Sequence, residues 1–340
     1  MIDLRSDTVT RPTEGMRKAM YNAEVGDDVF REDHTANAFQ EKVADLFGME
    51  SGVFVPSGVM GNQLALNVQS RPGDEVICDK TAHIYNYESA AGPFLSGIQF
   101  MLLHGKQGIL TPELIEAGFR GHNDWDPRTS IIALENTTNK GGGAFYTKEN
   151  LLAIRELATQ KGVALHLDGA RIWNASVASG IPFRFFGEIA DSISVCFSKA
   201  LGAPVGSMVL SNATLRREIL RKRKMWGGGM RQIGILAAAA DYALTNHLPG
   251  LKEDHRRAKE FSTFLSELPA FSIDVNSVHS NIVLFDVVGR SVEEVLKTLR
   301  ENGIGMSQFG PETIRAVFHL QVTDENLAEV KSVLASKFAK

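Results

Sequence analysis

The chain of 340 residues is poor in cysteine: it has two, Cys78 and Cys196, each within a run of strand-forming residues. Buried thiols are more common at such positions than a disulfide or a pair of metal ligands. The low cysteine content excludes a disulfide-stabilised scaffold and is typical of a reducing compartment. We therefore expect a cytoplasmic protein, and the sequence indicates no set of metal ligands.

The sequence also shows neither a signal peptide nor a convincing membrane span. Its first residues, MIDLRSDTVT, contain no basic segment followed by an apolar one. Residues 51–70 carry no charged side chain and are numerous enough to cross a bilayer. Because this segment includes Pro56, three glycines and several amide side chains, we expect it to lie within a soluble domain.

A large excess of charge of one sign is missing as well. The net charge is −4 and the sequence pI is about 6.2, which argues against a nucleic-acid or anionic-membrane partner. The local exception is a basic run, RREILRKRK at residues 216–224. We interpret this run as the solvated face of a helix.

Two nucleotide-binding motifs are absent from the chain. No GxGxxG occurs, and the one strand–turn–helix segment rich in glycine lacks the Gly-Lys-Ser/Thr of a Walker loop. A dinucleotide-dependent oxidoreductase is therefore a poor alternative for the function.

Short β-rich runs alternate with helical patterns over most of the chain. A helix is predicted at residues 148–160, because Thr147 can cap its start and Gly162 follows its end. Such alternation predicts an α/β fold with a mostly parallel seven-stranded sheet. The candidate strands are residues 53–55, 75–78, 98–103, 130–135, 163–168, 192–198 and 207–210.

The pattern changes near residues 246–250. A charged helix, a strand, a helix, a strand and a final helix follow, at residues 252–268, 281–287, 292–302, 314–319 and 324–338. This order predicts a smaller C-terminal α+β domain. We divide the chain into an N-terminal arm (residues 1–15), a large α/β domain (16–247) and a small domain (248–340).

Three polar clusters fall at the ends of predicted strands, where open α/β sheets bind ligands. In the first, VFVPSGVMGNQLAL, a strand leads through Ser57 and Gly58 into a helix. Glycines let the backbone approach a ligand, and a helix start offers free N–H groups to a phosphate. An ordinary strand-to-helix turn explains this segment equally well.

The other two clusters place Asp168 and Lys199 at strand ends. An acid there is often a turn or cap residue, and a lysine is often turned outward to solvent. A lysine beside apolar walls or other cations can instead form a Schiff base. We interpret the neighbouring His166 as a structural residue.

Taken together, the three clusters are more specific than any one of them. A phosphate cradle, an acid and a lysine in this order match the needs of pyridoxal 5'-phosphate. The acid would keep the pyridine nitrogen protonated, and the lysine would hold the aldehyde as an imine.

At this level of detail the chain resembles the low-specificity L-threonine aldolases, pyridoxal-phosphate enzymes of the aspartate-aminotransferase-like fold. The resemblance extends nearly from end to end. The blocks that carry it are LRSDTVTRPT, VGDDVFREDHTAN, FVPSGVMGNQ, AHIYNYE, LENTTNKGGG, HLDGAR, FSKALGAPVGS and GGGMRQIGILAAA.

The resemblance implies a role for each matching position. Lys199 would form the Schiff base and His83 would lie over the cofactor ring, while Lys224 and Arg231 would come from a neighbouring subunit in a dimer of dimers. The substrate carboxylate would be held by Ser6, Arg171 and Arg315. The cofactor-binding residues that it implies are Lys199, Asp168, Arg171, Ser57, Gly58, Val59, His83, Lys224 and Arg231.

The reaction implied by the resemblance is cleavage of L-threonine, L-allo-threonine or a related β-hydroxy-α-amino acid to glycine and an aldehyde. The base for the β-hydroxyl proton is His83 or His122, since imidazole suits proton transfer near neutral pH. Glu88 acting through a water molecule is a third candidate.

Several positions depart from the family pattern and leave the substrate open. The family usually has Tyr-Gly-Glu-Asp-Pro-Thr where this chain has FREDHT at residues 30–35. It usually has Thr and His where Val59 and Thr138 stand. Alternatives on the same scaffold are a phenylserine aldolase, a β-eliminating lyase or a racemase, and outside catalysis a silent cofactor-binding protein.

Overall fold

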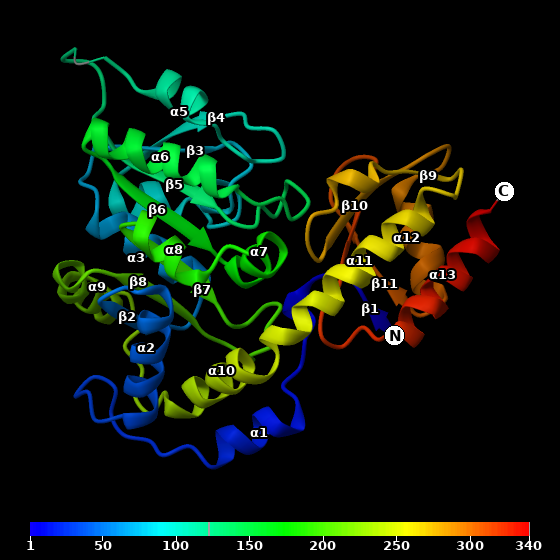
Figure 1. The fold of residues 1–340 in the computed structure, drawn as a ribbon, viewed down its shortest axis with the longest axis horizontal. Helices are drawn as coiled ribbons and strands as arrows, with labels where there is room; N and C mark the ends of the chain where they lie inside the picture. The colour runs from blue at the N-terminus through cyan, green and yellow to red at the C-terminus, as the bar shows by residue number, and fades with distance from the viewer. Residues whose placement is uncertain (122, 340) are drawn as a thin grey trace.

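A seven-stranded sheet forms the centre of the computed structural model, which describes residues 1–121 and 123–339. The strand order is β2-β8-β7-β6-β5-β3-β4, and β8 alone runs against its neighbours in this sheet. This confirms the predicted, mostly parallel α/β fold (Figure 1). The strands are β2 (Ser51–Val55), β3 (Glu75–Asp79), β4 (Gln99–Leu103), β5 (Thr129–Glu135), β6 (Ala164–Gly169), β7 (Ser192–Cys196) and β8 (Ser207–Ser211).

The predicted elements are present, and their ends shift by at most three residues. Helix α6 (Lys148–Lys161) begins where Thr147 Oγ1 accepts the Asn150 N–H and ends before Gly162, whose φ is 66°. One shift matters for the site: β7 ends at Cys196, so Lys199 lies in a bend beyond the strand rather than at its last position.

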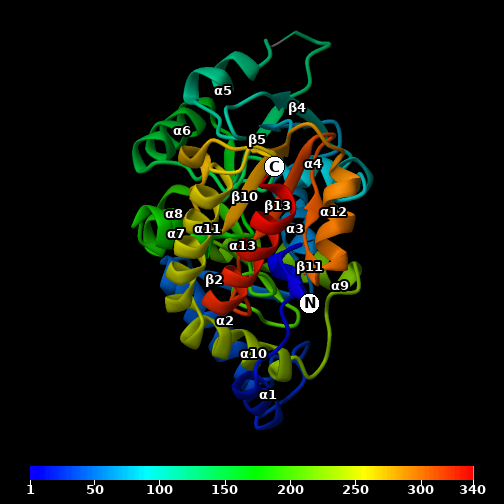
Figure 2. The ribbon, with the colours of Figure 1, turned by 90° about the vertical axis from the view of Figure 1, so that its right-hand side faces the viewer.

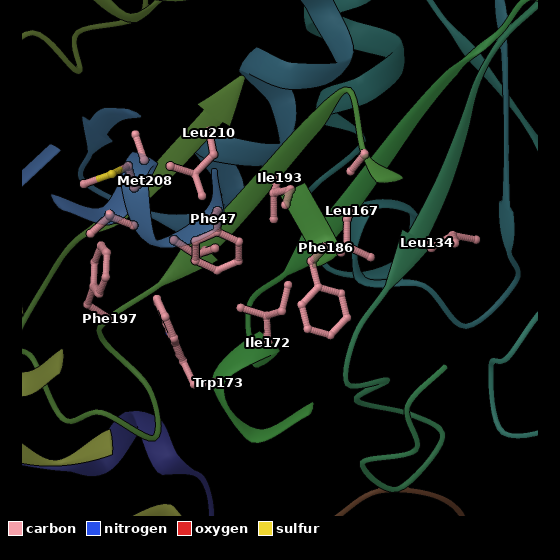
Figure 3. Close-up of a cluster of buried hydrophobic side chains, with 14 of the residues drawn as sticks. Phe47, Leu134, Leu167, Ile172, Trp173, Phe186, Ile193, Phe197, Met208 and Leu210 are labelled. Atoms are coloured by element: carbon pink, nitrogen blue, oxygen red, sulfur yellow. The ribbon is translucent and has the colours of Figure 1, made fainter. Parts of the chain in front are cut away.

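Helices cover both faces of the sheet. One face is covered by α3 (Gly58–Val68) and α9 (Ala213–Met225). The larger core on the other face includes residues of α2 (His34–Phe47), α6, α7 (Ile172–Ser179) and α8 (Phe183–Ile189). Successive side chains of each strand point to opposite faces of the sheet. Figure 3 shows part of the larger core, built from Phe47, Leu134, Leu167, Ile172, Trp173, Phe186, Ile193, Phe197, Met208 and Leu210.

A second hydrophobic core lies in the C-terminal part of the chain. There the antiparallel sheet β12-β13-β10-β9 packs with α11 (Leu251–Leu265), α12 (Val292–Glu301) and α13 (Asp324–Phe338) (Figure 1). The predicted sequence of helix, strand, helix, strand and helix is confirmed. Its strands are β9 (Phe271–Ser272), β10 (Ile282–Val287), β12 (Ser307–Gln308) and β13 (Thr313–Val317).

The N-terminal segment joins the two parts of the molecule. Strand β1 (Ile2–Asp3) pairs in parallel with β11 (Ile304–Gly305), and Leu4 is buried in the second core. The chain then crosses to the larger part, where α1 (Glu14–Tyr21) packs on α10 (Gly234–Asn246) (Figure 2). Residues 5–13 therefore run between the two parts.

Two of the expectations about chain segments can be compared directly with the structure. Both cysteines are free thiols and buried, as predicted. The uncharged residues 51–70 form β2, helix α3 and their flanking turns. Within the described residues, no helix has the length and apolar character that crossing a bilayer requires.

Candidate active site

The candidate site lies at the edge where the parallel strands end. There β3 leads to His83, β6 carries Asp168, and the segment after β7 carries Lys199. One ligand atom each of His83, Glu88 and Asp168 lies within 4.8 Å of the others. The charge of Lys199 acts on His83 and also on Asp7. Residues far apart in sequence thus meet here, as the strand-end argument predicts.

Asp168 is held in a fixed orientation. Its side chain is buried, Oδ2 accepts a hydrogen bond from Asn62 Nδ2 at 2.9 Å, and Oδ1 accepts the Ala170 N–H at 3.1 Å. Asn62 comes from α3 and also donates to Glu88 Oε1 at 2.8 Å. A carboxylate held by neutral donors stays available to a cationic ring nitrogen. The predicted structural role of His166 agrees with its burial and its hydrogen bond to Ser192 Oγ.

His83 and Glu88 form a second pair at this edge. His83 Nδ1 lies 2.9 Å from Glu88 Oε1, and Gln63 Nε2 donates to Glu88 Oε2 at 2.6 Å. Burial lowers the pKa of His83, but the Glu88 hydrogen bond and the charges of Asp168 and Glu88 outweigh it, so the pKa is raised. Glu88 is 2% exposed. This burial favours a role in which Glu88 tunes His83 over the predicted role as a base that acts through a water molecule.

Arg171 is already engaged by a residue that the sequence interpretation overlooked. Its Nε and Nη2 donate to the two carboxylate oxygens of Asp7 at 2.8 and 2.7 Å, and both residues are buried. Burial opposes ionisation of Asp7, but the charge and hydrogen bonds of Arg171 win and lower its pKa to about 2. Such a fork-shaped ion pair fixes the guanidinium plane.

Arg315 reaches the site from β13. Its Nη1 donates to Asn139 Oδ1 at 2.8 Å and its Nη2 to the Arg5 carbonyl at 3.0 Å. Burial and the charge of Arg171 lower the pKa of Arg315 to about 10. Ser6 lies next to Asp7 on the N-terminal segment, and its Oγ accepts the Thr8 N–H at 3.2 Å.

Lys199 is half-buried, and its position depends on the end of β7. Trp173 Nε1 donates to the Cys196 carbonyl at 2.8 Å, which fixes the last residue of the strand. Among residues 1–121 and 123–339, no carboxylate oxygen lies within ion-pairing distance of Lys199 Nζ. The Lys199 amine is therefore not engaged in an ion pair with any described carboxylate and stays available for covalent chemistry.

The start of α3 has the geometry of an anion site. Ser57 caps the helix by accepting the Met60 N–H at 3.2 Å, and Gly58 and Val59 form its first turn. The first N–H groups of a helix have no intrahelical acceptor. The structure adds a packing reason for Gly58: a Cβ there would lie 2.7 Å from Cys196 Sγ on β7.

The basic run lies on α9, and its interpretation as a solvated face is wrong at Arg223. This side chain is buried, with Nη2 donating to Asp28 Oδ2 at 2.7 Å. Lys224 and Arg231 are exposed, and Arg231 Nη1 donates to Asp27 Oδ2 at 2.9 Å. Within the described residues, neither side chain is joined to Asp168 by a hydrogen bond or an ion pair.

The residues at the strand edge fit pyridoxal phosphate. Both side-chain atoms of Asn136 are buried without a hydrogen-bond partner among the described residues. Asn136 follows β5, and its N–H donates to the Asp168 carbonyl at 2.8 Å. An orphaned buried amide is costly unless a ligand satisfies it. A polar aromatic ligand between the acid and the lysine would supply the missing partners.

The sequence interpretation missed Asp7, Asn62, Glu135 and Asn136. A usable signal existed for Glu135, which ends an apolar strand just as Asp168 does. Asn62 and Gln63 are polar residues that follow the apolar first turn of α3. Nothing local marks Asp7 as the partner of Arg171. His122, predicted as a possible base, lies outside the described residues.

Three positions that depart from the family pattern differ in backbone conformation, exposure and hydrogen bonding. Arg31 has a φ of 62°, a left-handed conformation that favours the glycine usual in the family. Phe30 is 70% exposed. Thr138 Oγ1 donates to the Gln107 carbonyl at 2.9 Å.

Comparison with known proteins assigns the chain to a family. Residues 3–288 match the family model described as Beta-eliminating lyase. The chain is 40% identical to "Low-specificity L-threonine aldolase 1" of Arabidopsis thaliana over 96% of this chain and 93% of the relative. It is 38% identical to the low specificity L-threonine aldolase of Escherichia coli K12 over 97% of each. The chain belongs to the low-specificity L-threonine aldolase family.

Solved structures confirm the fold expected for this family. A threonine aldolase from Leishmania major superposes with a TM-score of 0.85 at 18% identity, covering 99% of each chain. A putative L-allo-threonine aldolase from Listeria monocytogenes superposes with a TM-score of 0.80 at 22% identity, covering 95% of this chain and 93% of that one. The predicted family and fold are therefore both confirmed.

Proposed function

We propose that this carbon–carbon lyase is a pyridoxal-phosphate-dependent threonine aldolase that cleaves L-threonine or L-allo-threonine to glycine and acetaldehyde. Family membership supports this class of enzyme. The observation that carries the proposal is the meeting of Asp168 and His83 at one sheet edge, where the charge of Lys199 also acts on His83; the three come from different strand ends. No contact in the described residues favours elimination over aldol cleavage.

Four of the chain's own groups suit the cofactor. When bound, pyridoxal phosphate supplies an aldehyde carbon that takes up an amine and a ring that accepts an electron pair. Lys199 would hold that aldehyde, Asp168 would accept the ring N–H, and the start of α3 with Ser57 would hold the phosphate. Asn136 would gain the partner that its buried amide lacks.

Two arginines and a serine suit the substrate carboxylate. Arg315 is half-buried and retains a buried Nε without a hydrogen-bond acceptor among the described residues. Arg171 is held by Asp7, so it presents its free edge in one orientation. Ser6 lies beside this ion pair and has a hydroxyl that can donate. Together these groups would orient the bond that breaks.

His83 is the described residue best placed to take the β-hydroxyl proton. Its Nδ1 is engaged by Glu88, which leaves Nε2 for proton exchange. The raised pKa makes the imidazole a stronger base. His122 remains an alternative base that lies outside the described residues.

A second subunit would complete the site. Lys224 and Arg231 are exposed on α9 and the segment that follows it, and Arg231 is paired with Asp27 there. We propose a homo-oligomer, a dimer of dimers, in which these cations lie near the neighbour's phosphate.

The reaction is tested by purifying the protein, recording its visible absorbance and measuring aldehyde release from threonine, allo-threonine and phenylserine. We expect a visible band from bound cofactor and aldehyde with equimolar glycine, and both are lost in Lys199→Ala. Ammonia and a keto acid in place of glycine would overturn the proposal in favour of elimination.

A further inference from the structure

A buried carboxylate that the proposed reaction does not use connects the two sides of the site. Glu135 ends β5 and is 8% exposed. Its Oε2 accepts the backbone N–H of His83 and its Oε1 accepts the backbone N–H of Asn139, both at 2.7 Å. One side chain thus holds the segment after β3 and the loop after β5.

Each of these two segments presents a functional group. His83 carries the imidazole next to Asp168, and Asn139 Oδ1 accepts a hydrogen bond from Arg315 Nη1 at 2.8 Å. The three hydrogen bonds form one continuous path from Arg315 through Asn139 and Glu135 to His83.

A carboxylate side chain is well suited to accept two backbone N–H groups at once. An ionised carboxylate is the only side chain that offers acceptors at both ends and no donor. No cation lies within 4.0 Å of it among the described residues. Burial and the charge of Asp168 raise its pKa to about 7, so the ionised form is costly to the fold.

We propose that Glu135 is a positioning residue, which fixes His83 relative to Arg315 by binding the backbone of both supporting segments. This inference rests on the proposed function for its catalytic meaning. The geometric part, two N–H groups held by one carboxylate, stands without it.

Hydrogen exchange tests the geometric part in the intact protein. In Glu135→Gln one end of the side chain becomes a donor, so at least one of the two N–H groups loses its acceptor. We expect amide exchange to rise about 10-fold in a peptide containing His83 or Asn139. Asp191→Asn is a control at the opposite sheet edge, where Asp191 accepts the Leu165 N–H and pairs with Arg155; it should leave exchange in both peptides unchanged. Unchanged exchange in both peptides would overturn the proposal.

Steady-state kinetics tests the catalytic part with a double-mutant cycle. Asn139→Ala removes the acceptor of Arg315 but keeps the N–H on Glu135, so we expect about a 10-fold higher KM for threonine at nearly normal kcat. Glu135→Gln should raise KM and lower kcat. In the double variant, KM should equal that of Asn139→Ala while kcat stays low.

The outcomes separate the two proposals. Independent, multiplying effects on KM would show that Glu135 does not act through Asn139. A wild-type protein that binds cofactor but releases no aldehyde would remove the proposed reaction, and the exchange result would still decide the role of Glu135.

Discussion

Asp7 shows how one residue outside the sheet sets the electrostatics of the strand edge. It is the buried carboxylate that lies against Arg171, and the charges of Lys199 and Arg315 also act on it. Arg171, Lys199 and Arg315 therefore all act on one carboxylate, which comes from the N-terminal segment. Removing one partner of a buried pair leaves an uncompensated charge, which is strongly destabilising.

Replacing Asp7 by asparagine should change how stability depends on pH. A pKa lowered from 3.8 to about 2 means that ionised Asp7 stabilises the fold above about pH 4, by about 2 kcal/mol. This contribution is lost as the pH falls through about 2. Urea unfolding at pH 6 and pH 3 should show the gap between wild type and Asp7→Asn shrinking by about 1 kcal/mol. A gap of equal size at both pH values would contradict this.

Glu88 should raise the pH below which activity is lost, because it raises the pKa of His83. A base acts in its neutral form, so activity falls as the pH drops below its pKa. Glu88→Gln removes a charge that raises the pKa of His83, and the acid limb of kcat/KM should therefore move to lower pH.

The control for this change is Gln63→Leu, which removes the hydrogen bond from Gln63 Nε2 to Glu88 Oε2 but no charge. Its acid limb should stay near that of wild type. An acid limb that does not move in Glu88→Gln would show that another group, such as His122, is the base.

At the scale of elements, the approach of α3 to β7 decides where the phosphate would bind. The absent Cβ of Gly58 makes room for Cys196 Sγ. Close-packed contacts of this kind leave no space for an added methyl group without movement of the helix.

Gly58→Ala should therefore lower the free energy of unfolding by about 1–3 kcal/mol and weaken cofactor binding, measured by absorbance titration. The N–H of residue 58 is retained, so any loss comes from displacement of the helix. Cys196→Ala removes Sγ, and the double variant should recover most of both losses. Failure of the double variant to recover would place the defect elsewhere.

The sequence predicted the helices, the strands and the residues at strand ends better than it predicted which side chains pair with one another. The seven strands and the helix at α6 follow from periodicity and capping, which are local signals. Asp168 and Lys199 were predictable because polar residues after apolar strands converge at one edge. The pairing of Asp7 with Arg171 depends on how the N-terminal segment crosses the molecule, which no local pattern encodes.

Glu135 illustrates a second limit. Its position at a strand end is visible in the sequence, but its hydrogen-bond partners are backbone groups, which leave no residue-type signal. The prediction that the basic run is solvated was wrong at Arg223 for a related reason. Whether one residue of a helix face is buried depends on tertiary packing, which the local sequence does not show.

At the scale of the whole molecule, shared sites can be tested by complementation. Lys199→Ala and Arg231→Ala should each be nearly inactive as homo-oligomers. If Arg231 acts in the neighbour's site, a mixed dimer contains one site with both residues intact. Co-expression with two affinity tags should then yield hetero-oligomers with about a quarter to a half of wild-type activity. Inactive hetero-oligomers would place both residues in the same chain's site.

The crossing of the N-terminal segment also has a consequence for biosynthesis. Ile2 and Asp3 are synthesised well before their strand partners, Ile304 and Gly305. The nascent chain therefore cannot form the β1–β11 pairing until residues 304 and 305 have been synthesised, so a chain that ends before β11 would lack this tie even with the larger sheet in place.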